Sequence, residues 1–180
     1  GYGSDLDLVF LHNAPRGIST DGKKSIEAQQ FYIKLAQRIM HLLNTKTLFG
    51  QLYETDLRLR PSGNAGLLCC HIDGFEKYQT EEAWTWEHQA LVRARAICGA
   101  PRLLNDFTQV RSSILTRSRN AKTLADDVCK MRLKMREHLL SKENDKVDLK
   151  QCVGGITDIE FMAQYLVLAN AKSQAAMTEY

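Results

Sequence analysis

The chain has 180 residues, of which 44% are hydrophobic and 25% are charged, and its formal net charge is +3. This length allows one domain or two small ones with a proper core, and the composition is that of an ordinary globular protein. The small charge argues against general nucleic-acid binding, and no run of roughly 20 apolar residues or signal peptide suggests a membrane, so we expect a cytoplasmic protein.

The cysteines and histidines show no pattern of a disulfide framework or a zinc site. The five cysteines are odd in number and contain no Cys-x-x-Cys spacing. No pair among the five histidines has the spacing of metal ligands. We therefore expect reduced, mostly packed thiols.

The first predicted strand, residues 5–11, carries two acids. Side chains on a strand alternate between faces, so Asp5 and Asp7 project together while Leu6, Leu8 and Phe10 enter the core. A bare Asp-x-Asp is common on protein surfaces, where it caps turns without any chemistry. The pair indicates a functional site only if a further acid elsewhere in the chain joins it.

The predicted strand at residues 52–60 supplies that partner. Alternation places four polar side chains on one of its faces: Glu54, Asp56, Arg58 and Arg60. We expect Asp56 to join Asp5 and Asp7 from a neighbouring strand. Mg²⁺ is typically bound by a few carboxylates together with phosphate oxygens of a substrate, and neighbouring cations suit the same phosphates. Two Mg²⁺ ions in such a site stabilise the attacking and leaving oxygens of a displacement at phosphorus. The pattern predicts metal-assisted nucleotidyl transfer.

Between and after these strands the pattern predicts a loop, a helix and a further short strand. Turn residues favour a loop at 13–24, and apolar residues at helical spacing predict a helix over 25–44. Residues 67–72 are short and apolar like a strand. Asp73 is expected to cap a short helix that runs to about residue 79.

The second half of the chain looks helical. For residues 81–98 the pattern favours a helix and then a strand from about Leu91. Beyond Pro101 only helical stripes remain, and Thr157 with Glu160 matches a capping box at the start of the last helix. The predicted fold class is α+β, a small sheet domain followed by helices.

Four segments resemble a known family: residues 1–10, 53–63, 82–95 and 154–161. They are similar to the glutamine synthetase adenylyltransferases, also called glutamate-ammonia-ligase adenylyltransferases, and the likeness runs over essentially the whole chain. That family has one half that attaches AMP to a tyrosine of glutamine synthetase and one that removes it by phosphorolysis. The sequences of residues 1–7 and 60–66 are similar to those of the C-terminal half of the family, which attaches AMP.

The resemblance implies a DNA polymerase β-like nucleotidyltransferase domain at residues 1–100 and a helical domain at 101–180. Family members have a strand and a glycine-rich turn upstream of the position of Gly1, and further helices downstream. We therefore expect the first domain to lack its N-terminal part and the second to be incomplete at its C-terminus.

The resemblance also implies a site and a reaction. AMP passes from ATP to a tyrosine of glutamine synthetase with release of pyrophosphate, which regulates nitrogen assimilation. The implied partners are glutamine synthetase, the PII signalling protein and glutamine as effector. The implied cofactor is Mg²⁺ or Mn²⁺. The implied residues are the metal ligands Asp5, Asp7 and Asp56, the phosphate-binding turn Gly3–Ser4, and the phosphate-neutralising Arg58 and Arg60.

Several alternatives stay open. Arg58 and Arg60 also suit charges that protect the edge of a sheet from aggregation. Arg93 and Arg95 line either a strand or an exposed helix face. Asp158 and Glu160 lie in a segment that resembles the family, but they are explained adequately as first-turn acids favoured by the helix dipole. A fragment of this kind could also act mainly as a regulatory or binding module for glutamine synthetase or PII, or a related enzyme could modify another hydroxyl.

Overall fold

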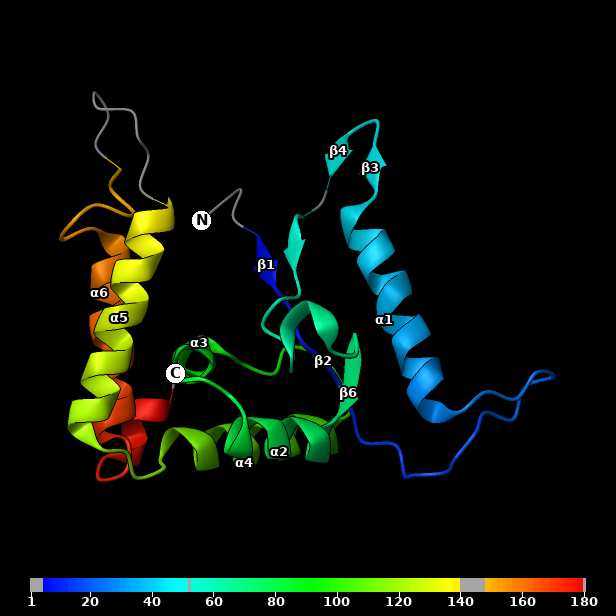
Figure 1. Cartoon of the computed structure of the whole chain (residues 1–180). Coiled ribbons are helices and arrows are strands. Elements are labelled where there is room, and N and C mark those ends of the chain that lie inside the picture. The colour runs from blue at the N-terminus through cyan, green and yellow to red at the C-terminus, as the bar shows by residue number, and fades with distance from the viewer. Residues whose placement is uncertain (1–4, 52, 140–147, 180) are drawn as a thin grey trace. The chain divides into compact units, whose positions relative to one another are not determined.

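A computed structural model describes residues 5–51, 53–139 and 148–179 of the chain, as a mixture of helices and short strands (Figure 1). The coarse α+β prediction is confirmed by this mixture. The structure divides into two compact units. The first contains residues 1–82 and 100–106, and the second contains residues 83–99 and 107–180. The nucleotidyltransferase domain expected at 1–100 and the helical domain expected at 101–180 stay predictions.

The predicted strand at 5–11 forms two short ladders with different partners. Strand β1 (Leu6–Asp7) pairs in parallel with β5 (Thr55–Asp56), and β2 (Phe10–His12) pairs in parallel with β6 (Cys69–His71). The change of partner occurs because β5 ends at Asp56 and a turn separates it from β6. The predicted strand at 52–60 is therefore much shorter than expected.

Helix α1 (Ala28–Asn44) begins three residues later than the predicted helix at 25–44. The preceding residues are held extended, because the Thr20 N–H donates to Ile26 O and the Ala28 N–H donates to Ile18 O, both at 2.9 Å. The helix packs on β5 and β6 and buries Ala36. Figure 1 shows at its end an antiparallel hairpin of β3 (Lys46–Thr47) and β4 (Gly50–Gln51), which the sequence pattern did not predict.

Helix α2 (Ile72–Glu81) follows β6 directly, as expected, but a different residue caps it. The N-cap is His71, whose Nδ1 accepts a hydrogen bond from the Asp73 N–H at 3.1 Å. Asp73 therefore lies inside the first turn, where the positive N-terminal end of the helix dipole stabilises its negative charge. Phe75 on this helix is one of the fully buried side chains of the first unit.

Helix α3 (Thr85–Arg93) confirms the helical part of the prediction for 81–98, but the strand expected from Leu91 is wrong. The buried guanidinium of Arg111 explains the difference. It donates to the carbonyl oxygens of Leu91 at 2.9 Å and Val92 at 2.7 Å. The last carbonyls of α3 are thus satisfied by a side chain rather than by a strand ladder.

The described elements beyond residue 100 are helices, as predicted. They are α4 (Pro101–Leu115), α5 (Ala121–Leu139), α6 (Ile156–Asn170) and the 3₁₀ helix η2 (Ala175–Thr178). Helices α5 and α6 lie side by side in Figure 1, and both contact α3. Ile114, Leu115 and Leu168 are almost fully buried in this unit. None of the described helices is both long and apolar enough to cross a bilayer.

The start of α6 differs from its prediction. Gly155 is the N-cap, so Thr157 and Glu160 do not form a capping box. Thr157 is buried, and Glu160 pairs with Arg93 on α3 at 2.8 Å.

Candidate functional site

Asp7 and Asp56 occupy the same register on two paired strands. The parallel pairing of β1 with β5 sets Leu6 against Thr55 and Asp7 against Asp56. Backbone hydrogen bonds fix this register, because the Leu6 N–H donates to Glu54 O and the Leu8 N–H to Asp56 O, both at 2.8 Å. Paired residues of neighbouring strands project to the same face at a strand spacing of roughly 5 Å. The backbone therefore brings two of the predicted ligands together.

Asp5 shares the exposed side of the first segment. Asp5 and Asp7 are exposed, whereas Leu6, Leu8 and Phe10 are partly buried, so the predicted alternation is present. Gly3 and Ser4, the predicted phosphate turn, lie outside the described residues.

Arg58 binds the Asp56 carboxylate. Its backbone N–H donates to Asp56 Oδ1 at 2.8 Å, its Nε donates to Oδ2 at 2.7 Å, and its terminal NH2 group also pairs with Oδ2. The side-chain hydrogen bond from Arg58 lowers the pKa of Asp56, against the raising effect of burial. The same hydrogen bond raises the pKa of Arg58, and the charges of Asp7 and Asp5 add to this shift. Arg58 thus experiences the field of all three predicted acids.

Arg60 has a different environment from Arg58. Its guanidinium donates to the carbonyl oxygens of Leu57 at 2.8 Å, Asn64 at 3.3 Å and Gly66 at 3.3 Å. Both arginines lie in the turn that follows β5 rather than on a strand, so the predicted strand face does not explain their positions. In this structure Arg60 holds the turn together.

Residues 57–66 form a tight turn, which contains the motif Arg-Pro-Ser-Gly-Asn-Ala-Gly at residues 60–66. Ser62 and Gly63 have left-handed φ angles of 60° and 53°, and the 3₁₀ helix η1 (Gly63–Ala65) follows. A Cβ atom at Gly66 would collide with the carbonyl oxygen of Pro61, so only glycine fits there. The turn fixes the chain just after Asp56.

The two paired carboxylates fit a hard divalent cation that takes its remaining ligands from a substrate. Mg²⁺ is commonly held by one or two carboxylates together with phosphate oxygens. Within residues 5–51, 53–139 and 148–179, no group of three or more His, Cys, Asp or Glu side chains is arranged to hold a metal ion. The register places Asp7 beside Asp56, and a metal-binding role for Asp5, Asp7 and Asp56 stays a prediction.

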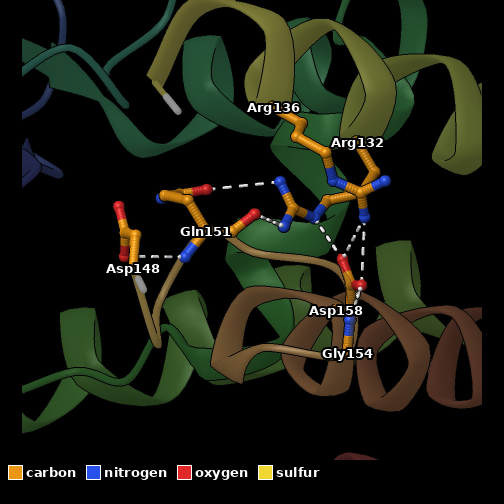
Figure 2. A network of polar contacts seen from close by, with 6 residues as sticks. All are labelled: Arg132, Arg136, Asp148, Gln151, Gly154 and Asp158. Carbon is orange, nitrogen blue, oxygen red and sulfur yellow. Dashed lines mark hydrogen bonds and ion pairs between the residues drawn. The ribbon is translucent and has the colours of Figure 1, made fainter. Parts of the chain in front are cut away.

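A second polar cluster lies between α5 and α6 (Figure 2). Asp158 accepts hydrogen bonds from Arg132 Nε at 2.6 Å, from Arg136 at 3.0 Å and from the Gly154 N–H at 2.7 Å. Arg132 also donates to the side-chain and backbone oxygens of Gln151. The Gly154 hydrogen bond and the two arginines lower the pKa of Asp158 against the raising effect of burial.

The cysteine prediction is confirmed in part. All five cysteines are free, but Cys98 and Cys129 are exposed rather than packed. Burial raises the pKa of Cys69 to about 12 and that of Cys70 to about 11, so these two are protonated and unreactive at neutral pH.

Comparison with known proteins decides the family. A model of the family described as glutamate-ammonia ligase adenylyltransferase matches residues 1–110. The chain is also 88% identical, over all 180 residues, to a protein of Alteromonas mediterranea (strain DSM 17117 / CIP 110805 / LMG 28347 / Deep ecotype). The relative is called a bifunctional glutamine synthetase adenylyltransferase/adenylyl-removing enzyme. The chain belongs to the glutamate-ammonia ligase adenylyltransferase family.

This member of the adenylyltransferase family spans 18% of the length of that relative. The relative is a nucleotidyltransferase that acts on glutamine synthetase, as its name states. The matched segment at residues 1–110 contains both strands that carry Asp7 and Asp56.

Sequence reasoning missed three arginines that link distant segments of this chain by hydrogen bonds and ion pairs. Arg111 and Arg132 are buried although their charge suggests a solvent position, and Arg136 joins Arg132 on Asp158. The available signal was weak. Arg132 and Arg136 are four residues apart on one predicted helix, but the sequence pattern does not name the distant carboxylate that they share.

Proposed function

We propose that this chain carries the AMP-attaching site of a glutamine synthetase adenylyltransferase. The observation that carries the proposal is the register of Asp7 against Asp56 in a chain 88% identical to an enzyme of that name. In this proposal the first unit is the C-terminal, adenylylating copy of a DNA polymerase β-like nucleotidyltransferase domain. The helices that follow form the start of a helical domain.

The substrates are ATP and a tyrosine hydroxyl of glutamine synthetase, and the products are the AMP ester and pyrophosphate. Asp5, Asp7 and Asp56 are the proposed ligands of Mg²⁺ or Mn²⁺. A divalent ion bound there neutralises the charge of the triphosphate and of the leaving pyrophosphate. The remaining chemistry is a matter of positioning, which the paired strands and the fixed turn supply.

Asp56 has a second role in this proposal. Its pKa is lowered, so the carboxylate is ionised at neutral pH and Oδ1 or Oδ2 is ready to accept a hydrogen bond from the acceptor hydroxyl. A depressed pKa makes Asp56 a weak base. It therefore orients the tyrosine O–H and takes its proton only as the oxygen–phosphorus bond forms.

Arg58 is the proposed cation for the phosphates. Its side chain is 72% exposed, so it can turn from Asp56 toward a bound triphosphate without disturbing packed groups. Gly3–Ser4 is the proposed turn that supports the phosphates. Arg60 contributes at a distance in this proposal, because it holds the turn at residues 57–66 and adds a positive field at Asp56.

Regulation by the PII protein and by glutamine belongs to the same proposal, with the setting in the cytoplasm. These effectors follow from the family resemblance. The AMP-attaching reaction is the part of the proposal that a direct experiment tests.

The experiment is transfer of α-labelled AMP from ATP to glutamine synthetase. It uses this chain, an N-terminally extended version, and the Asp7→Asn form of each. Label on a synthetase tyrosine that is lost in Asp7→Asn supports the proposal. Asp21→Asn is the matched control, because Asp21 is an exposed acid in the loop before α1. A folded, extended protein that binds glutamine synthetase but transfers no label would favour the binding-module alternative.

A further inference from the structure

The side chain of Asn44 joins three elements of the first unit. Asn44 is the last residue of α1. Its Nδ2 donates to Met40 O, one turn earlier in the helix, at 3.0 Å, and to Thr55 Oγ1 on β5 at 2.8 Å. Its Oδ1 accepts a hydrogen bond from Gln51 Nε2 on β4 at 3.4 Å. The end of α1, the hairpin and the strand that carries Asp56 are therefore tied together at one carboxamide.

The partners of the Asn44 carboxamide fix its orientation. A carboxamide donates through its nitrogen and accepts through its oxygen. The carbonyl of Met40 can only accept, so it requires the nitrogen, and the amide nitrogen of Gln51 can only donate, so it requires the oxygen. The second N–H of Nδ2 is then directed at the hydroxyl of Thr55. The contact from α1 to β5 is therefore a directed hydrogen bond.

Thr55 immediately precedes Asp56 on β5, so the two side chains lie on opposite faces of the strand. The Thr55 side contacts α1, and the Asp56 side carries the paired carboxylates. Strand β5 is only two residues long, and among residues 5–51, 53–139 and 148–179 its one strand partner is β1. A short ladder leaves the position of a strand weakly determined. The hydrogen bond from Asn44 adds a fixed point on the face opposite Asp56.

Asn170 shows what an asparagine at a helix end does without such a partner. It is the last residue of α6, and its Nδ2 donates to Leu166 O at 2.8 Å, the same bond to the preceding turn that Asn44 makes. In the part of the chain that the structure describes, the Asn170 carboxamide makes no hydrogen bond to another helix or strand. The bond to Thr55 is thus an addition to the usual role of a helix-terminal asparagine.

We propose that Asn44 is a positioning residue for Asp56 in AMP transfer. Asn44 acts through Thr55, because their hydrogen bond holds β5 against the end of α1 and so keeps the Asp56 carboxylate beside Asp7. This inference rests on the proposed function, since it gives Asn44 a part in that reaction. Positioning matters to the rate because a misplacement of about 1 Å can slow a reaction roughly a hundredfold.

The kinetic test measures transfer of labelled AMP to glutamine synthetase by the N-terminally extended protein. Asn44→Ala should lower kcat about tenfold or more, with KM for ATP unchanged, because the groups that bind substrate remain. Thr55→Val keeps the shape of the side chain but removes the hydroxyl, so it should cause the same loss. Thr55→Ser retains the hydroxyl and should keep most of the rate. Asn170→Ala is the matched control, because it loses the same helix-end bond and should leave kcat unchanged.

Hydrogen exchange of the Leu8 amide gives a readout that needs no turnover. This N–H donates to Asp56 O at 2.8 Å and therefore reports whether β5 stays paired with β1. Asn44→Ala and Thr55→Val should each speed its exchange about tenfold, because the strand opens locally more often. The amides of α2 should exchange as in the parent, which separates local opening from a general loss of stability.

The two measurements together decide the inference. Lower kcat with faster Leu8 exchange in both variants supports it. Faster exchange at an unchanged kcat would show that Asn44 is only structural, and a lower kcat at unchanged exchange would show that it does not act through β5. Either result overturns the positioning role. A parent that transfers no label would remove the proposed function itself, and the exchange rates would still show whether Asn44 holds β5.

Discussion

Asp7 on β1 lies directly opposite Asp56 on β5, on neighbouring parallel strands whose register is fixed by backbone hydrogen bonds. Two carboxylates at one register repel each other unless a cation lies between or beside them. In this structure the cation beside Asp56 is Arg58. The two carboxylates therefore create a negative potential that favours a cation at the place where the proposed reaction needs one.

Removal of Arg58 should raise the pKa of Asp56 toward its usual value of 3.8, because the hydrogen bond from Arg58 is the largest cause of the lowered pKa. The carboxyl carbon of Asp56, followed by NMR titration in Arg58→Ala, measures this change. Arg60→Ala is the control, since Arg60 acts only through its more distant charge and should shift the pKa less. Equal shifts in the two variants would contradict the assigned cause.

Asp158→Asn should lower the free energy of unfolding by about 3 kcal/mol, because it leaves Arg132 buried without its anionic partner. The Arg132 side chain is only 8% exposed, so solvent cannot replace the lost carboxylate. Urea unfolding measures the change. Glu160→Gln is the control, because its partner Arg93 is 62% exposed and such surface pairs contribute about 1 kcal/mol or less. Equal losses in both variants would mean that burial of Arg132 is unimportant.

The same carboxylate should make stability depend on pH in the acid range. The folded pKa of Asp158 lies below its usual 3.8. Its contribution to stability is therefore fully present above that usual pKa and is lost as the pH falls through the folded pKa. Unfolding free energies measured from about pH 5 downward should fall more steeply for the parent than for Asp158→Asn. Parallel curves would show that Asp158 is not linked to folding.

Gly66→Ala should destabilise the turn after Asp56 by roughly 2 kcal/mol or more, since the added Cβ forces Pro61 to move and disturbs an acceptor of Arg60. Gly74→Ala on α2 is the matched control. A Cβ at Gly74 meets nothing within 4 Å, and alanine favours a helix by roughly 0.5–1 kcal/mol, so this variant should be more stable than the parent. Thermal unfolding compares them, and opposite signs are expected.

The sequence predicted what depends on local periodicity and missed what depends on distant partners. Alternation correctly placed Asp5 and Asp7 on the exposed side, and helical spacing correctly predicted α1 and the helices beyond Pro101. The strand expected from Leu91 failed because Arg111, twenty residues away, satisfies the carbonyls at the end of α3.

In the candidate site, too, some features follow from local sequence patterns and others depend on distant contacts. The pairing of Asp7 with Asp56 follows from two strand patterns, and the parallel register confirms their proximity. The contacts of Arg60 could not be predicted from alternation, because they depend on a turn with left-handed φ angles at Ser62 and Gly63. The anchoring of Asp158 by Arg132 and Arg136 depends on the packing of two helices that no local pattern specifies.

In the proposed reaction Asp7 and Asp56 act as one unit in AMP transfer, and a double-mutant cycle tests this most directly. The rate of labelled AMP transfer to glutamine synthetase is measured in the N-terminally extended protein for Asp7→Asn, Asp56→Asn and the double variant. Each single change should reduce the rate about a thousandfold, or about 4 kcal/mol, and the double variant should lose little more than either. Losses that multiply in the double variant, or an Asp7→Asn protein as fast as its parent, would contradict the claim.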